Sequence, residues 1–144
     1  MTDKPVTIRA ATVAVIATTT LAFLSPCLAA SDAEIGSLGD KMSGAFKCAT
    51  YASMSHDQKE QQRLFQIGLT AGREYVEGLK SRDDPKSELL AFMRAAPTDF
   101  VVGQMYESES TQAYDEIVQN QLDADAAKTQ AELRYRQSKC SLIN

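Results

Sequence analysis

The chain has 144 residues, with 15 Lys and Arg against 19 Asp and Glu, and a net charge of −4 with its one histidine neutral. An acidic balance without a basic run argues against nucleic-acid binding, because that affinity comes largely from cationic side chains at the phosphates. The same balance disfavours an anionic membrane surface.

The first thirty residues have the layout of a secretory signal peptide. Lys4 and Arg9 precede an apolar or small-residue run over residues 10–24, and the small residues Ala29 and Ala30 follow. The run is shorter than the roughly 20 residues that a membrane-spanning helix needs, so we expect no transmembrane anchor. We predict cleavage after Ala30, with cleavage after Ala29 as the alternative.

The same segment also contains a cysteine in a second motif. Residues 24–27, Leu-Ser-Pro-Cys, resemble a bacterial lipoprotein signal. Pro26 stands where that signal usually has Gly, Ala or Ser, so we interpret residues 1–30 as a cleaved leader and not as a lipidation signal at Cys27. The leader contains two basic residues and one acidic residue, so its removal leaves residues 31–144 as a single domain of net charge −5.

Removal of the leader leaves two cysteines, Cys48 and Cys140. An even count in an exported protein favours one disulfide, which here would close most of the processed chain. In the loop-entropy model a closure of this length stabilises the fold by roughly 4 to 5 kcal/mol. Two buried thiols are the alternative. A catalytic dithiol usually has Cys-x-x-Cys spacing, which this sequence lacks.

Helical periodicity dominates the processed chain, and no run of strict apolar and polar alternation predicts a strand. The sequence therefore predicts an all-α fold, a compact bundle of five to six helices. We expect a first helix over residues 32–53 and a second that starts in the break at residues 53–57 and ends near Lys80. Gly68 and Gly72 lie one turn apart in the second helix, where another helix could approach closely.

A third helix is predicted over residues 85–95, with Asp84 as its N-cap and Pro85 at its first position. Its apolar residues cover a broad surface, so we expect it to pack on more than one neighbour. These residues are Leu89, Leu90, Phe92 and Met93.

Three further helices complete the prediction. Thr98 or Asp99 would cap a short fourth helix, and the polar residues 107–110 would separate it from a fifth helix that carries residues 114–122. The last helix, over residues 126–138, is polar enough to be marginal unless something fastens it. A bridge from the nearby Cys140 would do so.

No set of residues predicts a catalytic, cofactor or metal site. His56 is the only histidine, and it stands between Ser55 and Asp57 in a predicted turn. Neighbouring side chains on a turn are not held in line as nucleophile, base and orienting group. A zinc site needs three or four ligands, and both cysteines are expected to be bonded to each other. We interpret His56 as a surface residue.

The one local concentration of positive charge lies near the C-terminus, where Arg134 and Arg136 flank Tyr135. Tyrosine and arginine are favoured at protein interfaces, and arginine binds carboxylates through two hydrogen bonds, so these three residues are a candidate interaction site. The ordinary alternative is a tyrosine at the edge of the core with arginines that pair with the chain's own acidic residues.

An exported, acidic, helical domain with one disulfide and no catalytic set is most economically a binding protein. We expect a periplasmic or secreted protein that acts through protein–protein contact, such as an inhibitor, immunity or accessory protein, although fold alone does not fix function. A small envelope hydrolase is one alternative and would need a titratable group with a perturbed pKa in a cleft. A carrier would enclose an apolar ligand near Gly68, Gly72 and Met93.

Overall fold

Every regular element is helical in residues 31–82, 87–119 and 123–144, which the computed structural model describes. This confirms the all-α prediction. The elements are α1 (Asp32–Met54), α2 (Gln58–Lys80), α3 (Glu88–Ala95), α4 (Thr98–Val118), α5 (Ala124–Gln137) and a 3₁₀ helix, η1 (Cys140–Leu142). The predicted leader, with Cys27 and both predicted cleavage positions, lies outside the described residues.

The first two helices begin at side-chain caps. Ser31 caps α1 in a reciprocal arrangement, since its hydroxyl accepts from the Glu34 backbone N–H at 3.3 Å and its own N–H donates to the Glu34 carboxylate at 2.7 Å. Asp57 caps α2 and accepts from the Glu60 backbone N–H at 3.0 Å. Between the two helices His56 adopts a left-handed conformation with φ of 64°, which closes the turn.

The helix predicted to end before residues 107–110 instead continues through them, so the expected fourth and fifth helices are one helix, α4. This segment is polar, but it packs on α1. The Thr50 hydroxyl lies 3.0 Å from the Ser110 hydroxyl, and Lys47 pairs with Glu109 at 3.5 Å. These tertiary contacts favour a continuous helix where local sequence suggests a break.

Two predicted helix starts are also wrong. Pro97 is the N-cap of α4, without a side-chain hydrogen bond, and Thr98 is already helical. Helix α3 begins at Glu88, later than predicted, because Ser87 is extended and its hydroxyl accepts from the Leu90 backbone N–H at 3.3 Å. The predicted cap Asp84 and Pro85 lie outside the described residues.

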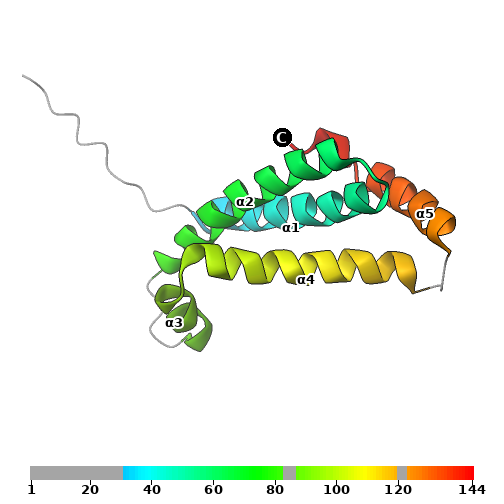
Figure 1. Cartoon of the computed structure of the whole chain (residues 1–144). Helices are drawn as coiled ribbons and strands as arrows, with labels where there is room; N and C mark the ends of the chain where they lie inside the picture. The colour runs from blue at the N-terminus through cyan, green and yellow to red at the C-terminus, as the bar shows by residue number, and fades with distance from the viewer. Residues whose placement is uncertain (1–30, 83–86, 120–122) are drawn as a thin grey trace, which may run out of the picture.

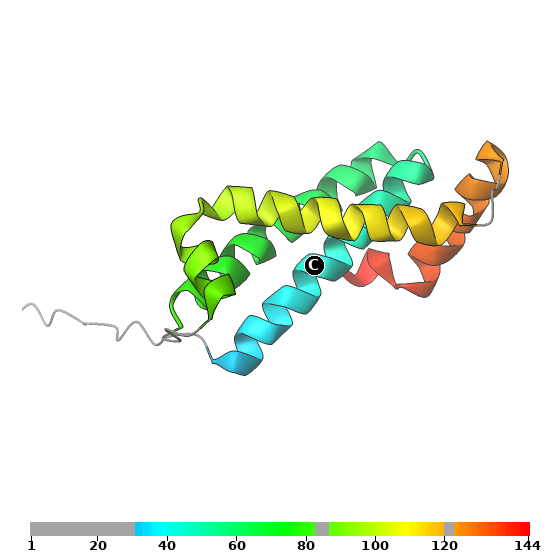
Figure 2. The same ribbon diagram turned by 90° about the horizontal axis from the view of Figure 1, so that it is seen from below.

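Helices α1 and α2 form an antiparallel hairpin, and α4 runs across both of them (Figures 1 and 2). Figure 1 shows α3 at one end of α4 and α5 at the other end, with the chain terminus returning beside α1 and α2. The hairpin is therefore the centre of the fold, and each remaining element packs on one or both of its helices.

Two clusters of buried side chains form the core. One surrounds Cys48 and Cys140 and includes Leu64 and Ile117, and the other lies toward α3. Phe65 packs against both clusters and so joins them. The second cluster is made of Met42, Phe46, Ala71, Val76, Leu90, Met93, Val101 and Val102.

The two glycines of α2 lie where neighbouring helices come closest. A Cβ atom on Gly68 would lie 2.5 Å from the Phe46 ring, and one on Gly72 would lie 2.9 Å from Cγ1 of Val102. Atoms that are not bonded do not approach this closely, so the missing side chains let α1 and α4 pack tightly on α2. Phe46 fills the space beside Gly68, and Val102 fills the space beside Gly72.

Candidate functional site

A disulfide between Cys48 and Cys140 fastens the end of the chain to α1. The Cα atoms are 5.6 Å apart, the two residues are separated by 92 positions in the sequence, and both side chains are buried. Lys139, just before the bridge, has a left-handed conformation with φ of 53°, which turns the chain from α5 into η1. The pairing predicted from the cysteine count is thus present in the fold.

A hydrogen-bond network reinforces this connection from α2. The Arg63 guanidinium donates to the backbone carbonyls of Ile143 at 2.6 Å and Cys140 at 3.3 Å. The Glu60 carboxylate accepts two hydrogen bonds from the same guanidinium, at 2.8 and 2.6 Å. Glu60 also accepts from the Tyr135 hydroxyl, so α2, α5 and η1 share one network.

This network moves the pKa values of its carboxylate and its tyrosine farther from neutral pH. Hydrogen bonds from Arg63 lower the pKa of Glu60 to about 2, and the Tyr135 hydroxyl contributes in the same direction. Burial, followed by the hydrogen bond to Glu60, raises the pKa of Tyr135 to about 12. Burial and the Glu116 carboxylate, which accepts from the Tyr51 hydroxyl at 3.0 Å, raise the pKa of Tyr51 to about 12. None of these shifts suits acid–base catalysis near pH 7.

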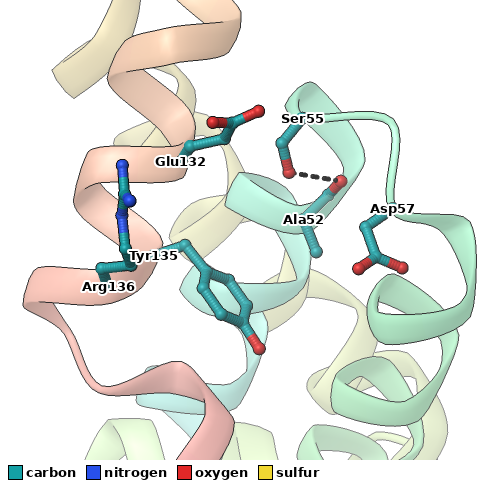
Figure 3. Close-up of a pocket in the computed structure, with 6 residues that line it drawn as sticks. All are labelled: Ala52, Ser55, Asp57, Glu132, Tyr135 and Arg136. Atoms are coloured by element: carbon teal, nitrogen blue, oxygen red, sulfur yellow. Dashed lines mark hydrogen bonds between the residues drawn. The ribbon is translucent and has the colours of Figure 1, made fainter.

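A groove of about 310 Å³ lies beside this network, between α5 and the turn that joins α1 to α2 (Figure 3). Figure 3 shows Glu132, Tyr135 and Arg136 on the α5 side, and Ser55 and Asp57 on the turn side. The turn residues are occupied by structural hydrogen bonds, because Ser55 donates to backbone carbonyls of α1 and Asp57 caps α2. Glu132 and Arg136 are the exposed charged residues of the groove that make no such structural hydrogen bond to a described residue.

Of the three residues predicted as an interaction site, Tyr135 and Arg136 line this groove and Arg134 does not. Successive residues of a helix point about 100° apart, and these three therefore meet different surroundings. Arg136 is exposed in the groove, whereas Tyr135 points to Glu60 on α2. Arg134 is half-buried near Tyr51, and its Nε has no hydrogen-bond partner in the described part of the chain. Arg136 alone combines exposure with a position in the groove.

A second surface, at the opposite end of α4, was not predicted from the sequence. Leu89 and Phe92 share one face of α3 and are 64% and 54% exposed, while Leu90 and Met93 on its other face are buried. Phe100, in the first turn of α4, is 52% exposed. The apolar residues of α3 predict that this helix packs on more than one neighbour. In the structure α3 packs chiefly on α2, and the outer face lacks a cover from the described residues.

Within the described ranges, no group of three or more His, Cys, Asp and Glu side chains is placed to bind a metal ion. The same residues include no helix with the length and apolar character needed to cross a membrane. Comparison with known proteins gave no match to a protein-family model, a curated protein or a solved structure.

Proposed function

We propose that this chain is an exported helical binding protein that acts through protein–protein contact, and that the exposed apolar surface of Leu89, Phe92 and Phe100 is its contact surface. The exposure of these three large side chains, which lie on α3 and in the first turn of α4, carries the proposal. Neighbouring exposed apolar side chains mark interaction sites in soluble proteins, and aromatic residues contribute strongly to the binding energy there.

Polar contacts hold this surface in place. The Lys80 ammonium at the end of α2 donates to the Ala96 carbonyl at 3.1 Å and to the Thr98 hydroxyl at 2.6 Å. Arg73 of α2 pairs with Asp99 in the first turn of α4 at 2.7 Å. These bonds span the connection between α3 and α4, so a partner would meet a surface that is already ordered, which lowers the entropic cost of binding.

The proposal of export rests on the N-terminal sequence and the disulfide. Disulfides persist in oxidising compartments such as the periplasm and the cell exterior. Cleavage after Ala30 would make Ser31 the first residue and would leave its hydroxyl cap on α1 intact. The new α-amino group would then face the Glu34 carboxylate, which already accepts from the Ser31 N–H. The ammonium and the carboxylate would partly compensate each other, which offsets the unfavourable position of a positive charge at a helix N-terminus.

The two alternative functions receive less support. A carrier of an apolar ligand would need space beside Gly68 and Gly72, and Phe46 and Val102 occupy it. A hydrolase would need an acid or base that titrates near neutral pH, whereas the large shifts of Glu60 and the two tyrosines move their pKa values away from neutrality.

Capture of the partner with a double variant tests the proposal. The full chain, a Leu89→Ser and Phe92→Ser double variant, and a Leu142→Ser control would each be expressed with the leader, crosslinked in cells and recovered from the envelope for mass spectrometry. Leu142 is a matched control because it is 69% exposed and lies in η1. We expect the parent and the control to retain one protein partner that the double variant loses. Equal capture by all three, or a bound small molecule in place of a protein, would contradict the proposal.

A further inference from the structure

A different groove, of about 370 Å³, lies between the second half of α1 and the middle of α4. This volume falls within the range of about 300–1,000 Å³ typical of small-molecule sites. None of its lining residues is charged, and six of them carry hydroxyl groups: Thr50, Ser53, Tyr106, Ser110, Thr111 and Tyr114. Uncharged hydroxyl groups therefore dominate the polar chemistry of the groove.

The buried part of the groove is held by a bond between the two helices. The Thr50 hydroxyl is buried and lies 3.2 Å from the Phe46 carbonyl and 3.0 Å from the Ser110 hydroxyl. A hydroxyl has a single proton, so Thr50 donates to one of these groups at a time, and both hydroxyls keep lone pairs that can accept from a ligand. Farther out, the exposed Ser53 and Thr111 hydroxyls make no hydrogen bond to another described residue, and they can both donate and accept.

Two tyrosine rings border the same groove. Tyr106, Ser110 and Tyr114 follow each other at intervals of four residues on α4 and so share one face. The Tyr106 ring is fixed by edge-on packing against Phe46 and Phe65, with centroid distances of 5.1 and 5.0 Å. The Tyr114 ring is half exposed. An aromatic ring in such a position offers a flat apolar surface beside hydroxyl groups.

The surrounding charges select against an anionic ligand. The adjoining surface of α4 carries carboxylates at Glu107, Asp115 and Glu116. Lys47, one turn before Thr50, is paired with Glu109. An anion would approach an acidic surface with no unpaired cation among the lining residues, while a cation would find no carboxylate in the groove itself. The groove suits a ligand that carries many hydroxyls and no charge.

From these contacts we infer that the groove between α1 and α4 binds a neutral oligosaccharide, with the apolar C–H face of one sugar ring on Tyr114 and its hydroxyls bonded to Ser110 and the outer hydroxyl groups. Sugars combine an apolar ring face with hydroxyls that donate and accept, which matches the two kinds of group that line the groove. This inference does not depend on a protein partner at α3, because the two surfaces share no residue.

Amide chemical shifts test this inference. The ¹⁵N-labelled protein, expressed with its leader and recovered from the periplasm, would be titrated with maltotriose, cellotriose and chitotriose in turn. We expect at least one trisaccharide to shift the amides of residues 50–54 and 106–114. Tyr114→Ala should weaken that binding about twofold to twelvefold, since packing on an aromatic ring contributes roughly 0.5–1.5 kcal/mol.

Leu133→Ala is the control, because Leu133 is an exposed apolar residue of α5 that belongs neither to the proposed contact surface nor to the lining of the groove. It should leave the affinity unchanged, and the amide spectrum of each variant reports whether the fold is intact. Three outcomes would overturn the inference. These are the absence of shifts with every trisaccharide, shifts centred on other residues, and shifts in the groove with choline or trigalacturonate but not with the neutral sugars.

Discussion

Gly68 and Gly36 are both helical glycines, but a methyl group would have opposite effects at the two positions. A Cβ on Gly68 would lie 2.5 Å from the Phe46 ring, whereas one on Gly36 would have no neighbour within 4 Å. We therefore expect Gly68→Ala to lower the free energy of unfolding by about 1–3 kcal/mol through overpacking. Gly36→Ala should raise it by up to about 1 kcal/mol, because alanine is the better helix former. Urea unfolding of both variants checks this, and a shift of both in the same direction would contradict it.

Glu60 should make stability depend on pH in the acid range. Its pKa is lowered from 4.5 to about 2 in the folded protein, chiefly by hydrogen bonds from Arg63. A lowered carboxyl pKa stabilises the fold above the ordinary value, and this stabilisation is lost as the pH falls through the folded value. Glu60→Gln should thus be less stable than the parent at neutral pH, and the difference should shrink between pH 4.5 and 2.

Thermal unfolding at a series of pH values measures this effect. Glu132→Gln is a suitable control, because Glu132 is exposed and has no ion pair among the described residues. It should melt close to the parent throughout. A gap between Glu60→Gln and the parent that stays constant down to pH 2 would show that the network does not hold the carboxylate ionised.

Sequence patterns predicted some of these residues and missed others, for a physical reason. The cysteine count paired Cys48 with Cys140, and the spacing of Gly68 and Gly72 indicated close packing. The bond from Arg63 to the Ile143 carbonyl joins residues 80 positions apart, and no local pattern reports it. Periodicity shows which face of a helix is apolar, but it does not show which polar side chain meets which distant backbone group.

At the scale of the elements, α5 depends most on contacts outside its own sequence. Ala131 is the only buried residue among its described positions, so apolar packing alone contributes little. The disulfide and the hydrogen bond from Tyr135 to Glu60 also attach α5 to the rest of the fold. We expect the double variant Cys48→Ala and Cys140→Ala to lose up to about 4–5 kcal/mol of stability.

Hydrogen exchange followed by mass spectrometry locates this loss. In the double variant, amides of α5 and η1 should exchange faster by a larger factor than those of the α1–α2 hairpin, because the bridge constrains the chain end directly. Equal acceleration in all helices would show instead that the disulfide stabilises the molecule only as a whole.

The helices themselves were largely predictable, and the errors share one cause. The predicted boundaries of α1 and α2 agree closely with the structure because apolar periodicity and capping residues coincide there. In α4 the polar residues 107–110 suggested a break, but Ser110 and Glu109 bond to α1. The broad apolar surface of α3 predicted packing on more than one neighbour. Leu90 and Met93 do join a cluster with residues of α1, α2 and α4, but the face of Leu89 and Phe92 stays exposed. Local pattern did not contain these tertiary contacts.

At the scale of the whole molecule, α4 connects two ends with different character. One end presents Leu89, Phe92 and Phe100 to solvent, and the other contains the fastened terminus with the charged groove beside Arg136. Phe65 joins the two core clusters between these ends. A continuous core lets the proposed contact surface at one end remain ordered while the disulfide stabilises the other end.

An exported protein held by this disulfide must leave the reducing cytosol, lose its leader and oxidise its two remaining cysteines. The most direct test is the intact mass of protein recovered from cells that express the full chain, measured with and without a thiol-labelling reagent under denaturing conditions. We expect a chain that begins at Ser31, with a mass lower by two hydrogens than that of reduced residues 31–144 and no labelled thiol. A chain that retains residues 1–30, or one in which Cys48 and Cys140 are both labelled, would contradict it.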